Sequence, residues 1–285
     1  MAVDRIIWKI ILDFIILAGV GFALLAVTLW MEPYHRGYFL NDESLSLPFK
    51  EQTISVSVLA SVGFAFIAVV VLIVEITRDR QGKGIGDKYI GDSAVPGWIW
   101  ESYQTIGVFT FGAACQHLTS DLAKNVIGRL RPHFYDVCKP IPRADSALNQ
   151  LGYIVEYDCY ADADPSLIKD MRLSFPSAHS SFAMYCAIFF IFYVQVKCKW
   201  RGSKLLRHAI QYAVFIAAWY VGLSRVVDHM HHWSDVAAGF LIGTIYACLV
   251  FVYVLKPKTA STLPTTWVDP PETVTNTLPR AALAR

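Results

Sequence analysis

The chain has 285 residues, of which 55% are hydrophobic and only 17% are charged, and its formal net charge is +2. Soluble globular domains have about 45–50% apolar and about 25% charged residues. With a mean hydropathy of +0.41, this composition favours an integral membrane protein. The sequence has no basic patch with interleaved aromatic residues, so it gives no indication of nucleic-acid binding.

Apolar segments long enough to cross a bilayer occur repeatedly along the chain. A spanning helix needs roughly 20 mostly apolar residues, and six segments qualify: about 10–31, 54–76, 98–121, 180–197, 206–223 and 236–255. We expect the first to be retained, because its apolar run is longer than the roughly 7–15 residues of a signal-peptide core. The fold class predicted is all-α, with six transmembrane helices in a membrane domain that covers residues 1–256.

The distribution of lysine and arginine predicts the orientation in the membrane. Cations are concentrated in the loop after the second span, in the loop after the fourth span and at the start of the tail, whereas the first loop has only Arg36 and Lys50. By the positive-inside rule, both termini are expected to be cytosolic, and loops one, three and five to face the lumen or the exterior. Residues 77–97 are glycine-rich, which predicts little regular structure, and the tail 257–285 is expected to be disordered.

Residues 123–175 form the longest predicted connection, and connections of this length are usually functional or disordered. This one begins with helical periodicity, so we expect part of it to be ordered. It also contains Cys138 and Cys159. A lumenal location would permit a disulfide between them, but the sequence leaves open whether it forms.

Three polar segments are expected on the lumenal side, and the first is "KNVIGRLRP", residues 124–132. Lys124 and Arg131 are seven positions apart, about two helical turns, so both can project from one face. Arginine offers a rigid fork of donors and lysine a mobile point charge. Two such cations suit a phosphate, although basic side chains also commonly extend to the interface at the end of a span.

The second segment is "SFPSAHSS", residues 174–181, which leads directly into an apolar helix. The first N–H groups of a helix lack internal partners and form a favourable place for an anion. Ser177 adds a hydroxyl, the amides near Ala178 add donors, and His179 adds a titratable group. The alternative is a serine cluster that only caps the helix.

The third segment is "SRVVDHMHHWSD", residues 224–235. His231 and Asp235 are at i,i+4, and a carboxylate on one imidazole nitrogen leaves the other as a nucleophile. Arg225 can reach the same volume. A zinc site needs three or four converging ligands, and histidines this close together on one turn do not converge, so no metal is expected. His229 and His232 are assigned to the lipid headgroup level.

Together, the three segments suit phosphoryl transfer in which protein cations stabilise the charge. The patterns Lys-x6-Arg-Pro (124–132), Pro-Ser-x-His (176–179) and Ser-Arg-x5-His-x3-Asp (224–235) resemble the signature motifs of the type-2 phosphatidic acid phosphatase superfamily. Segments such as "PYHRGYFLNDES" and "IGRLRPHFYDVC" resemble its animal lipid phosphate phosphatase branch, over about residues 10–255. Ala178 departs from the usual glycine, and a positive φ there would cost an alanine about 1 kcal/mol or more.

The resemblance implies a metal-independent hydrolase that acts on phosphatidic acid, lysophosphatidic acid, sphingosine 1-phosphate and ceramide 1-phosphate through a phosphohistidine. It implies that His231 is the nucleophile, oriented by Asp235, and that His179 is first the acid and then the base. The phosphate would be bound by Lys124, Arg131, Ser177, Ala178, Ser224 and Arg225.

No cofactor is expected, and the expected partners are lipid phosphates in the bilayer. A homo-oligomer is left open. The plasma membrane is the expected location, with the endoplasmic reticulum or Golgi as alternatives. Alternative functions are a silent lipid-phosphate-binding member, a polyprenyl diphosphate or sugar phosphate phosphatase, and a transporter gated by histidines. The last is disfavoured because the span centres have almost no ionisable residues.

Overall fold

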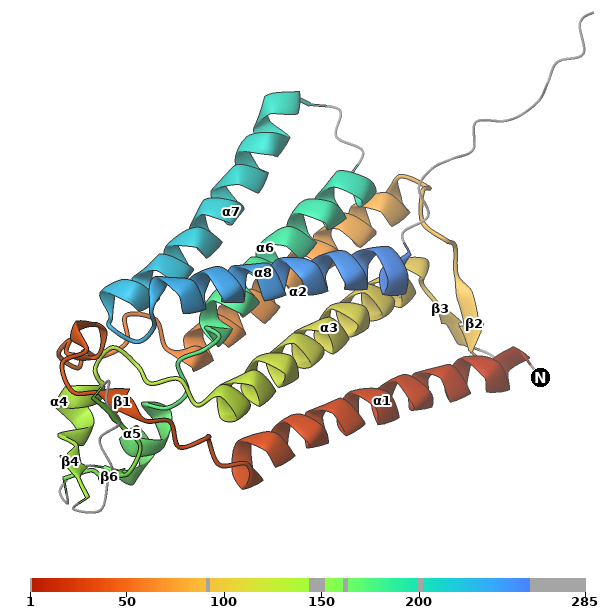
Figure 1. The fold of residues 1–285 in the computed structure, drawn as a ribbon. Coiled ribbons are helices and arrows are strands. Elements are labelled where there is room, and N and C mark those ends of the chain that lie inside the picture. The colour runs from red at the N-terminus through yellow and green to blue at the C-terminus, as the bar shows by residue number, and fades with distance from the viewer. Residues whose placement is uncertain (1, 91–92, 144–151, 161–163, 199–201, 257–285) are drawn as a thin grey trace, which may run out of the picture.

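The computed structural model describes residues 2–90, 93–143, 152–160, 164–198 and 202–256, and long helices dominate it (Figure 1). They are α1 (Ala2–Trp30), α2 (Val56–Arg80), α3 (Gly97–Ile127), α6 (Ala178–Lys197), α7 (Lys204–Val227) and α8 (Trp233–Leu249), which continues as the π-helical η2 (Val250–Leu255). Three short helices lie in the connections: η1 (Glu43–Leu45), α4 (Phe134–Cys138) and α5 (Pro165–Asp170). The all-α prediction therefore describes the main architecture.

Among the described residues, five helices are long and apolar enough to cross a membrane: Ile6–Trp30, Val56–Arg80, Ala178–Lys197, Leu205–Val227 and Trp233–Leu255. The third predicted span, 98–121, lies within α3, which is a 31-residue helix but does not belong to this set of five. Polar residues such as Gln104, Gln116 and His117 lower its hydropathy. Several of its polar side chains, including Gln116 and Ser120, are buried within the bundle, where they contact protein rather than lipid.

Helix α6 is the centre of the bundle and packs against α2, α3, α7 and α8. Its aromatic residues Phe182, Tyr185 and Phe189 join Phe109 of α3 and Phe251 of η2 in the largest apolar cluster. Helix α8 approaches the first turns of α6 at two glycines, because a Cβ on Gly239 or Gly243 would overlap the carbonyl of Ser177 or Ser181, respectively. This close approach, common at helix interfaces in membranes, brings the starts of α6 and α8 together. Helix α1 lies outside, against α3 (Figure 1).

The described parts of the third connection form a cap at one end of the bundle, together with part of the first loop. β1 (Tyr38–Phe39) pairs antiparallel with β5 (Tyr153–Ile154), and β4 (Ile141–Pro142) pairs antiparallel with β6 (Tyr157–Asp158). Tyr38, Phe134, Ile154 and Tyr157 belong to a second buried cluster. Burial of this cluster explains why so long a connection is largely ordered.

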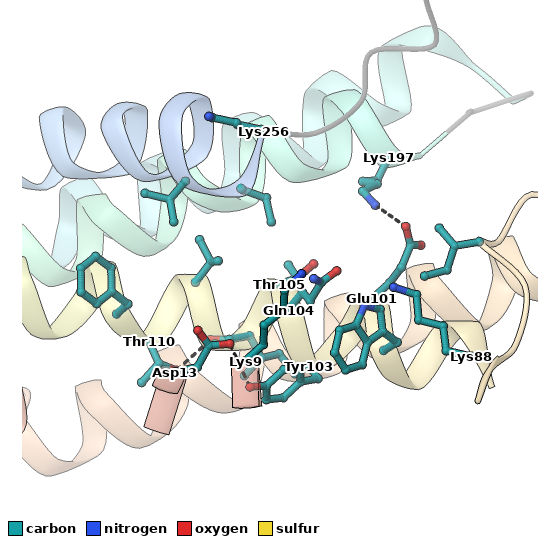
Figure 2. A pocket seen from close by; sticks show the side chains of 18 of the residues that line it. Lys9, Asp13, Lys88, Glu101, Tyr103, Gln104, Thr105, Thr110, Lys197 and Lys256 are labelled. Carbon is teal, nitrogen blue, oxygen red and sulfur yellow. Dashed lines mark hydrogen bonds and ion pairs between the residues drawn. The ribbon is translucent and has the colours of Figure 1, made fainter. Parts of the chain in front are cut away.

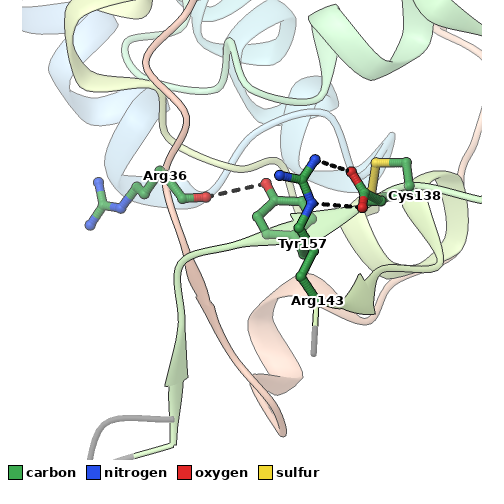
Figure 3. The surroundings of a disulfide bond; sticks show 6 residues. Arg36, Cys138, Arg143 and Tyr157 are labelled. Carbon is green, nitrogen blue, oxygen red and sulfur yellow. Dashed lines mark hydrogen bonds and ion pairs between the residues drawn. A yellow bond between two sulfur atoms is a disulfide. The ribbon is translucent and has the colours of Figure 1, made fainter. Parts of the chain in front are cut away.

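A disulfide joins Cys138 of α4 to Cys159, which directly follows β6 (Figure 3). The sequence had left this pairing open. Beside it, Arg143 forms an ion pair of 2.6 Å with Asp158, and the hydroxyl of Tyr157 donates to the carbonyl of Arg36 over 3.2 Å. The disulfide and the ion pair hold α4 and the residues that follow it against β6. The hydrogen bond of Tyr157 connects β6 to the first loop.

The prediction of little regular structure in residues 77–97 is wrong. Helix α2 continues to Arg80, and β2 (Lys88–Ile90) pairs antiparallel with β3 (Ser93–Val95), with Lys88 opposite Val95. Lys88 Nζ also lies 4.6 Å from the centre of the Trp100 ring, so a cation–π contact joins the hairpin to α3. The expectation of a disordered tail at 257–285 lies outside the described residues.

Candidate active site

One cavity of about 860 Å³ gathers residues from all three polar segments. It lies where α3 and α7 end and where α6 begins. Of the nine side chains or backbone positions predicted for catalysis or phosphate binding, six line this cavity: Lys124, Arg131, Ala178, His179, Arg225 and His231. The three others, Ser177, Ser224 and Asp235, lie buried next to lining residues. The helix packing thus assembles one polar site from segments about 50 positions apart in the chain.

The start of α6 is a capped helix N-terminus. Ser177 is the N-cap residue, with an extended backbone, and its side chain accepts from the amide of Ser180. Ala178 is the first helical residue, and it is not among the residues with positive φ. The strain that an alanine would suffer at positive φ therefore does not arise here. Ser177 acts as a cap, and the site keeps the free amides of the first turn of α6.

The imidazole of His231 is held by the backbone of the second segment. Its Nδ1 lies 2.7 Å from the carbonyl oxygen of Ser174. Because a carbonyl can only accept, Nδ1 carries the proton and Nε2 has a lone pair. Burial, together with the positive charges of Arg131 and Lys124, lowers the pKa of His231 well below 6.5. His231 is therefore neutral at pH 7, as a nucleophile must be.

Asp235 does not orient His231 in the way that the sequence suggested. Its Oδ2 is 3.9 Å from Nδ1 of His231, which is too long for a hydrogen bond. That oxygen accepts instead from the Ser174 hydroxyl at 2.6 Å and from the amide of His232 at 3.0 Å. The physical reason is helix capping, since Asp235 is at position N3 of α8 and turns back to the N-cap residue. Asp235 is thus connected to His231 through Ser174.

Arg129 completes this arrangement, and the sequence analysis assigned it no role. Its Nη1 donates to Oδ1 of Asp235 at 2.5 Å and to the Ser234 hydroxyl at 2.8 Å. Asp235 has no exposed surface, and a buried carboxylate requires a cation or several donors. That requirement was a signal for Arg129, two positions before Arg131 in the same motif. Ser174, the first residue of the second segment, was also missed.

The three predicted phosphate-binding cations each contact a carboxylate. Lys124 Nζ is 3.1 Å from Oδ1 of Asp121, and Arg131 Nη2 is 2.7 Å from Oδ1 of Asp170. Arg225 forms an ion pair with Asp228 and donates to the carbonyl of Ile54 at 3.2 Å. These carboxylates hold the cations in position, and they reduce the positive charge of the cavity.

Four polar atoms of the lining residues are buried without a hydrogen-bond partner within the described part of the chain: Nε of Arg131, Nε2 of His179, Nε2 of Gln116 and Oδ1 of Asn125. A buried polar atom left unpaired costs about 1–3 kcal/mol. A ligand with acceptor oxygens would pair with the donors of Arg131 and Gln116. The cavity therefore has the chemistry of a site for a phosphoryl group.

The two other histidines of the third segment, His229 and His232, and Ser224 form hydrogen bonds with neighbouring protein groups. His232 is the N-cap residue of α8, with Nδ1 3.2 Å from Oδ2 of Asp235. His229 has a positive φ of 57° and places Nδ1 2.8 Å from the carbonyl of Pro48. Both side chains contact protein, and their place at the lipid headgroup level stays a prediction. The Ser224 hydroxyl donates to the carbonyl of Val221 at 2.8 Å. Among described residues, no three His, Cys, Asp or Glu side chains converge as metal ligands would.

The chain is similar to known proteins over most of its length. The family model described as PAP2 superfamily matches residues 105–259. A Drosophila melanogaster protein named "Putative phosphatidate phosphatase" is 41% identical over 93% of this chain and 74% of its own length. Mouse phospholipid phosphatase 1 is 38% identical over 84% of this chain and 81% of its own length. Mouse phospholipid phosphatase 2 is 37% identical over 86% of this chain and 85% of its own length. No solved structure matches the chain significantly.

Proposed function

The chain belongs to the PAP2 superfamily, and from this premise we propose that it is a membrane-bound lipid phosphate phosphatase, a phosphoric monoester hydrolase. One observation carries the proposal most directly. A neutral histidine, His231, lines the same cavity as the unpaired Nε2 of His179 and the unpaired Nε of Arg131. A nucleophile, an acid–base group and an oxyanion donor are thereby combined in one site.

The reaction that these groups support has two steps. In the first, the Nε2 lone pair of His231 attacks phosphorus, the bond from phosphorus to the lipid oxygen breaks, and protonated His179 donates its proton to that oxygen. In the second, His179 takes a proton from water, and the resulting hydroxide attacks the phosphohistidine. Inorganic phosphate leaves, and His231 regains its lone pair. No divalent cation is needed for either step.

Charge on the transferred phosphoryl group is stabilised by fixed donors. Arg131, Arg225 and Lys124 line the cavity, and the first amides of α6 point out of a helix N-terminus. Donors that are already in place cost no reorganisation during the reaction. Their ion pairs with Asp121, Asp170 and Asp228 supply this preorganisation.

The walls of the cavity support a lipid substrate. Beyond the charged groups, it is lined by apolar residues of α1 and α2, which include Leu24, Val56, Leu59 and Phe64. Acyl or sphingoid chains can lie against these helices while the phosphate reaches His231. The proposed substrates are phosphatidic acid, lysophosphatidic acid, sphingosine 1-phosphate and ceramide 1-phosphate.

We place the site at the lumenal or extracellular face of six spans, with both termini cytosolic. With 31 residues, α3 is about 46 Å long, and a bilayer core is about 30 Å thick, so length permits it to be the sixth span. The Cys138–Cys159 disulfide lies at the same end as the cavity, and disulfides persist in oxidising compartments. Arg78 and Arg80 end α2 at the other side, as cytosolic residues should. The proposed location is the plasma membrane.

The test is phosphate release by the purified full-length protein from each of the four lipids and from a polyprenyl diphosphate, with and without EDTA. We expect release from the four phosphomonoesters that EDTA leaves unchanged. His231→Ala should abolish release while the protein stays folded, as thermal unfolding would show. Turnover by His231→Ala would contradict the nucleophile, and loss of activity in EDTA would contradict the metal-free reaction. Binding without release by the unmodified protein would identify a silent member.

A further inference from the structure

A second cavity, of about 1350 Å³, is shown in Figure 2 and lies near the β2–β3 end of the bundle in Figure 1, opposite to the candidate active site. Its walls come from the first half of α1, the ends of α2, α6 and η2, and the beginning of α3. The proposed phosphatase reaction makes no use of it. The two cavities have one lining residue in common, Thr110 of α3, so both lie along the side of α3 that α1 covers.

Positive charge predominates in the second cavity. Among the described residues, two carboxylates line it, Asp13 and Glu101, against six basic side chains, Lys9, Arg78, Lys83, Lys88, Lys197 and Lys256. Buried Glu75 adds a third carboxylate at the wall, where it contacts Arg78 at 2.8 Å and Lys197 at 3.3 Å. Counting all three carboxylates, the cations still exceed them by three. The basic residues come from different elements and surround one volume, as Figure 2 shows for Lys9, Lys88, Lys197 and Lys256.

An unpaired donor lies in the wall of this cavity. Trp100 is 6% exposed and lines the cavity, and its Nε1 is buried without a hydrogen-bond partner in the described part of the chain. A buried indole N–H normally has a partner. The face of the same ring contacts Nζ of Lys88. The wall therefore offers both a free donor and a cation to a ligand that has acceptor atoms.

The uncharged part of the wall combines apolar side chains with the polar residues Gln81, Tyr103, Gln104, Thr105 and Thr110. Phe14 and Leu17 of α1 and Ile106, Val108 and Phe111 of α3 line it. A soluble anion would leave this apolar part empty, whereas a lipid would fill it with hydrocarbon. Anionic phospholipids are concentrated in the cytosolic leaflet, where each nearby lysine or arginine contributes about 1 kcal/mol to their attraction. The lysines at the ends of α6 and η2 are expected on that side.

We propose that this cavity is a binding site for one anionic phospholipid of the cytosolic leaflet, whose headgroup lies among Lys9, Lys197 and Lys256 and whose chains lie between α1 and α3. The inference does not depend on the phosphatase activity. The bound lipid would fill the space between α1 and the bundle, because α1 otherwise packs mainly on α3.

The experiment measures lipid selectivity of the full-length protein in phosphatidylcholine nanodiscs. Spin-labelled phosphatidylserine and phosphatidylcholine are compared by the fraction of each that the protein immobilises. We choose phosphatidylserine because it is a phosphodiester and not a phosphomonoester. The variants are Lys9→Gln and Lys256→Gln, each tested alone. The matched control is Arg80→Gln, because Arg80 is an exposed cation at the end of α2 next to the cavity but does not line it.

We expect the unmodified protein to prefer phosphatidylserine, and each lysine variant to lower the relative association constant about fivefold. Arg80→Gln should keep the preference, and inorganic phosphate should not displace the labelled lipid. Equal immobilisation of the two lipids by the unmodified protein would overturn the proposal. So would an equal loss in Arg80→Gln, which would indicate general surface charge, or displacement by inorganic phosphate, which would indicate a site for a free anion.

Discussion

Replacing Arg129 with glutamine removes the cation that contacts the buried carboxylate of Asp235. Asp235 has no exposed surface and accepts from Arg129 at 2.5 Å, from Ser174 at 2.6 Å and from the amide of His232 at 3.0 Å. A hydrogen bond to a charged group contributes about 1.5–3 kcal/mol. The Arg129 side chain is 31% exposed, so water can replace part of that contact. We therefore expect Arg129→Gln to lower the free energy of unfolding by about 1–2 kcal/mol.

The same substitution should affect the reaction, because Asp235 also positions Ser174. If the carboxylate moves, the carbonyl of Ser174 no longer holds Nδ1 of His231 in place. A loss of about 1.4 kcal/mol in transition-state stabilisation corresponds to about a tenfold lower kcat. KM should change less, because Arg129 lies behind the cavity wall and does not line it.

A double-mutant cycle tests this reasoning. Arg129→Gln, Asp235→Asn and the combined variant are compared by kcat for phosphate release and by the unfolding midpoint in detergent. We expect the combined loss to fall short of the sum by about 1 kcal/mol or more, as for residues in direct contact. Arg143→Gln is the control, because its pair with Asp158 is more than half exposed and should contribute little. Additive losses, or unchanged kcat and midpoint in Arg129→Gln, would refute the coupling.

Three further expectations concern histidines and cysteines. His229→Asn should retain nearly full phosphate release, because asparagine tolerates the φ of 57° at this position; a loss as complete as that of His231→Ala would contradict this. Because burial lowers the pKa of His231, the unfolded state takes up the proton first, so stability falls as pH drops below about 6.5. His231→Gln should flatten the pH dependence of the unfolding midpoint between about pH 7 and pH 5, and an unchanged slope would disprove the assignment. Cys138→Ser opens a loop with a sequence separation of 21 and should lower the unfolding free energy by about 3 kcal/mol. Cys159→Ser should lower it by the same amount. An unshifted denaturation curve in either variant would count against the disulfide.

The sequence by itself determined the class of protein and most residues of the site. Hydropathy over some 20 residues is a local property, so the helices that cross a membrane could be predicted without knowledge of their packing. The motif spacings were also local, and they singled out Lys124, Arg131, His179, Arg225 and His231, which the helix packing brings to one cavity. Helix α3 is harder to assign as a span from hydropathy, because its polar residues are explained by their burial inside the bundle and not by the sequence of the segment itself.

Only the tertiary structure decided which groups hold the nucleophile. An i,i+4 spacing places Asp235 near His231, but it does not determine which acceptor lies within hydrogen-bond distance. That depends on how closely α8 approaches the start of α6, which Gly239 and Gly243 permit. At that approach, the carbonyl of Ser174 accepts from His231, and Asp235 turns to its own helix cap and to Arg129. Hydrogen bonds act over about 3 Å, so differences smaller than one helical turn decide between partners that the sequence cannot distinguish.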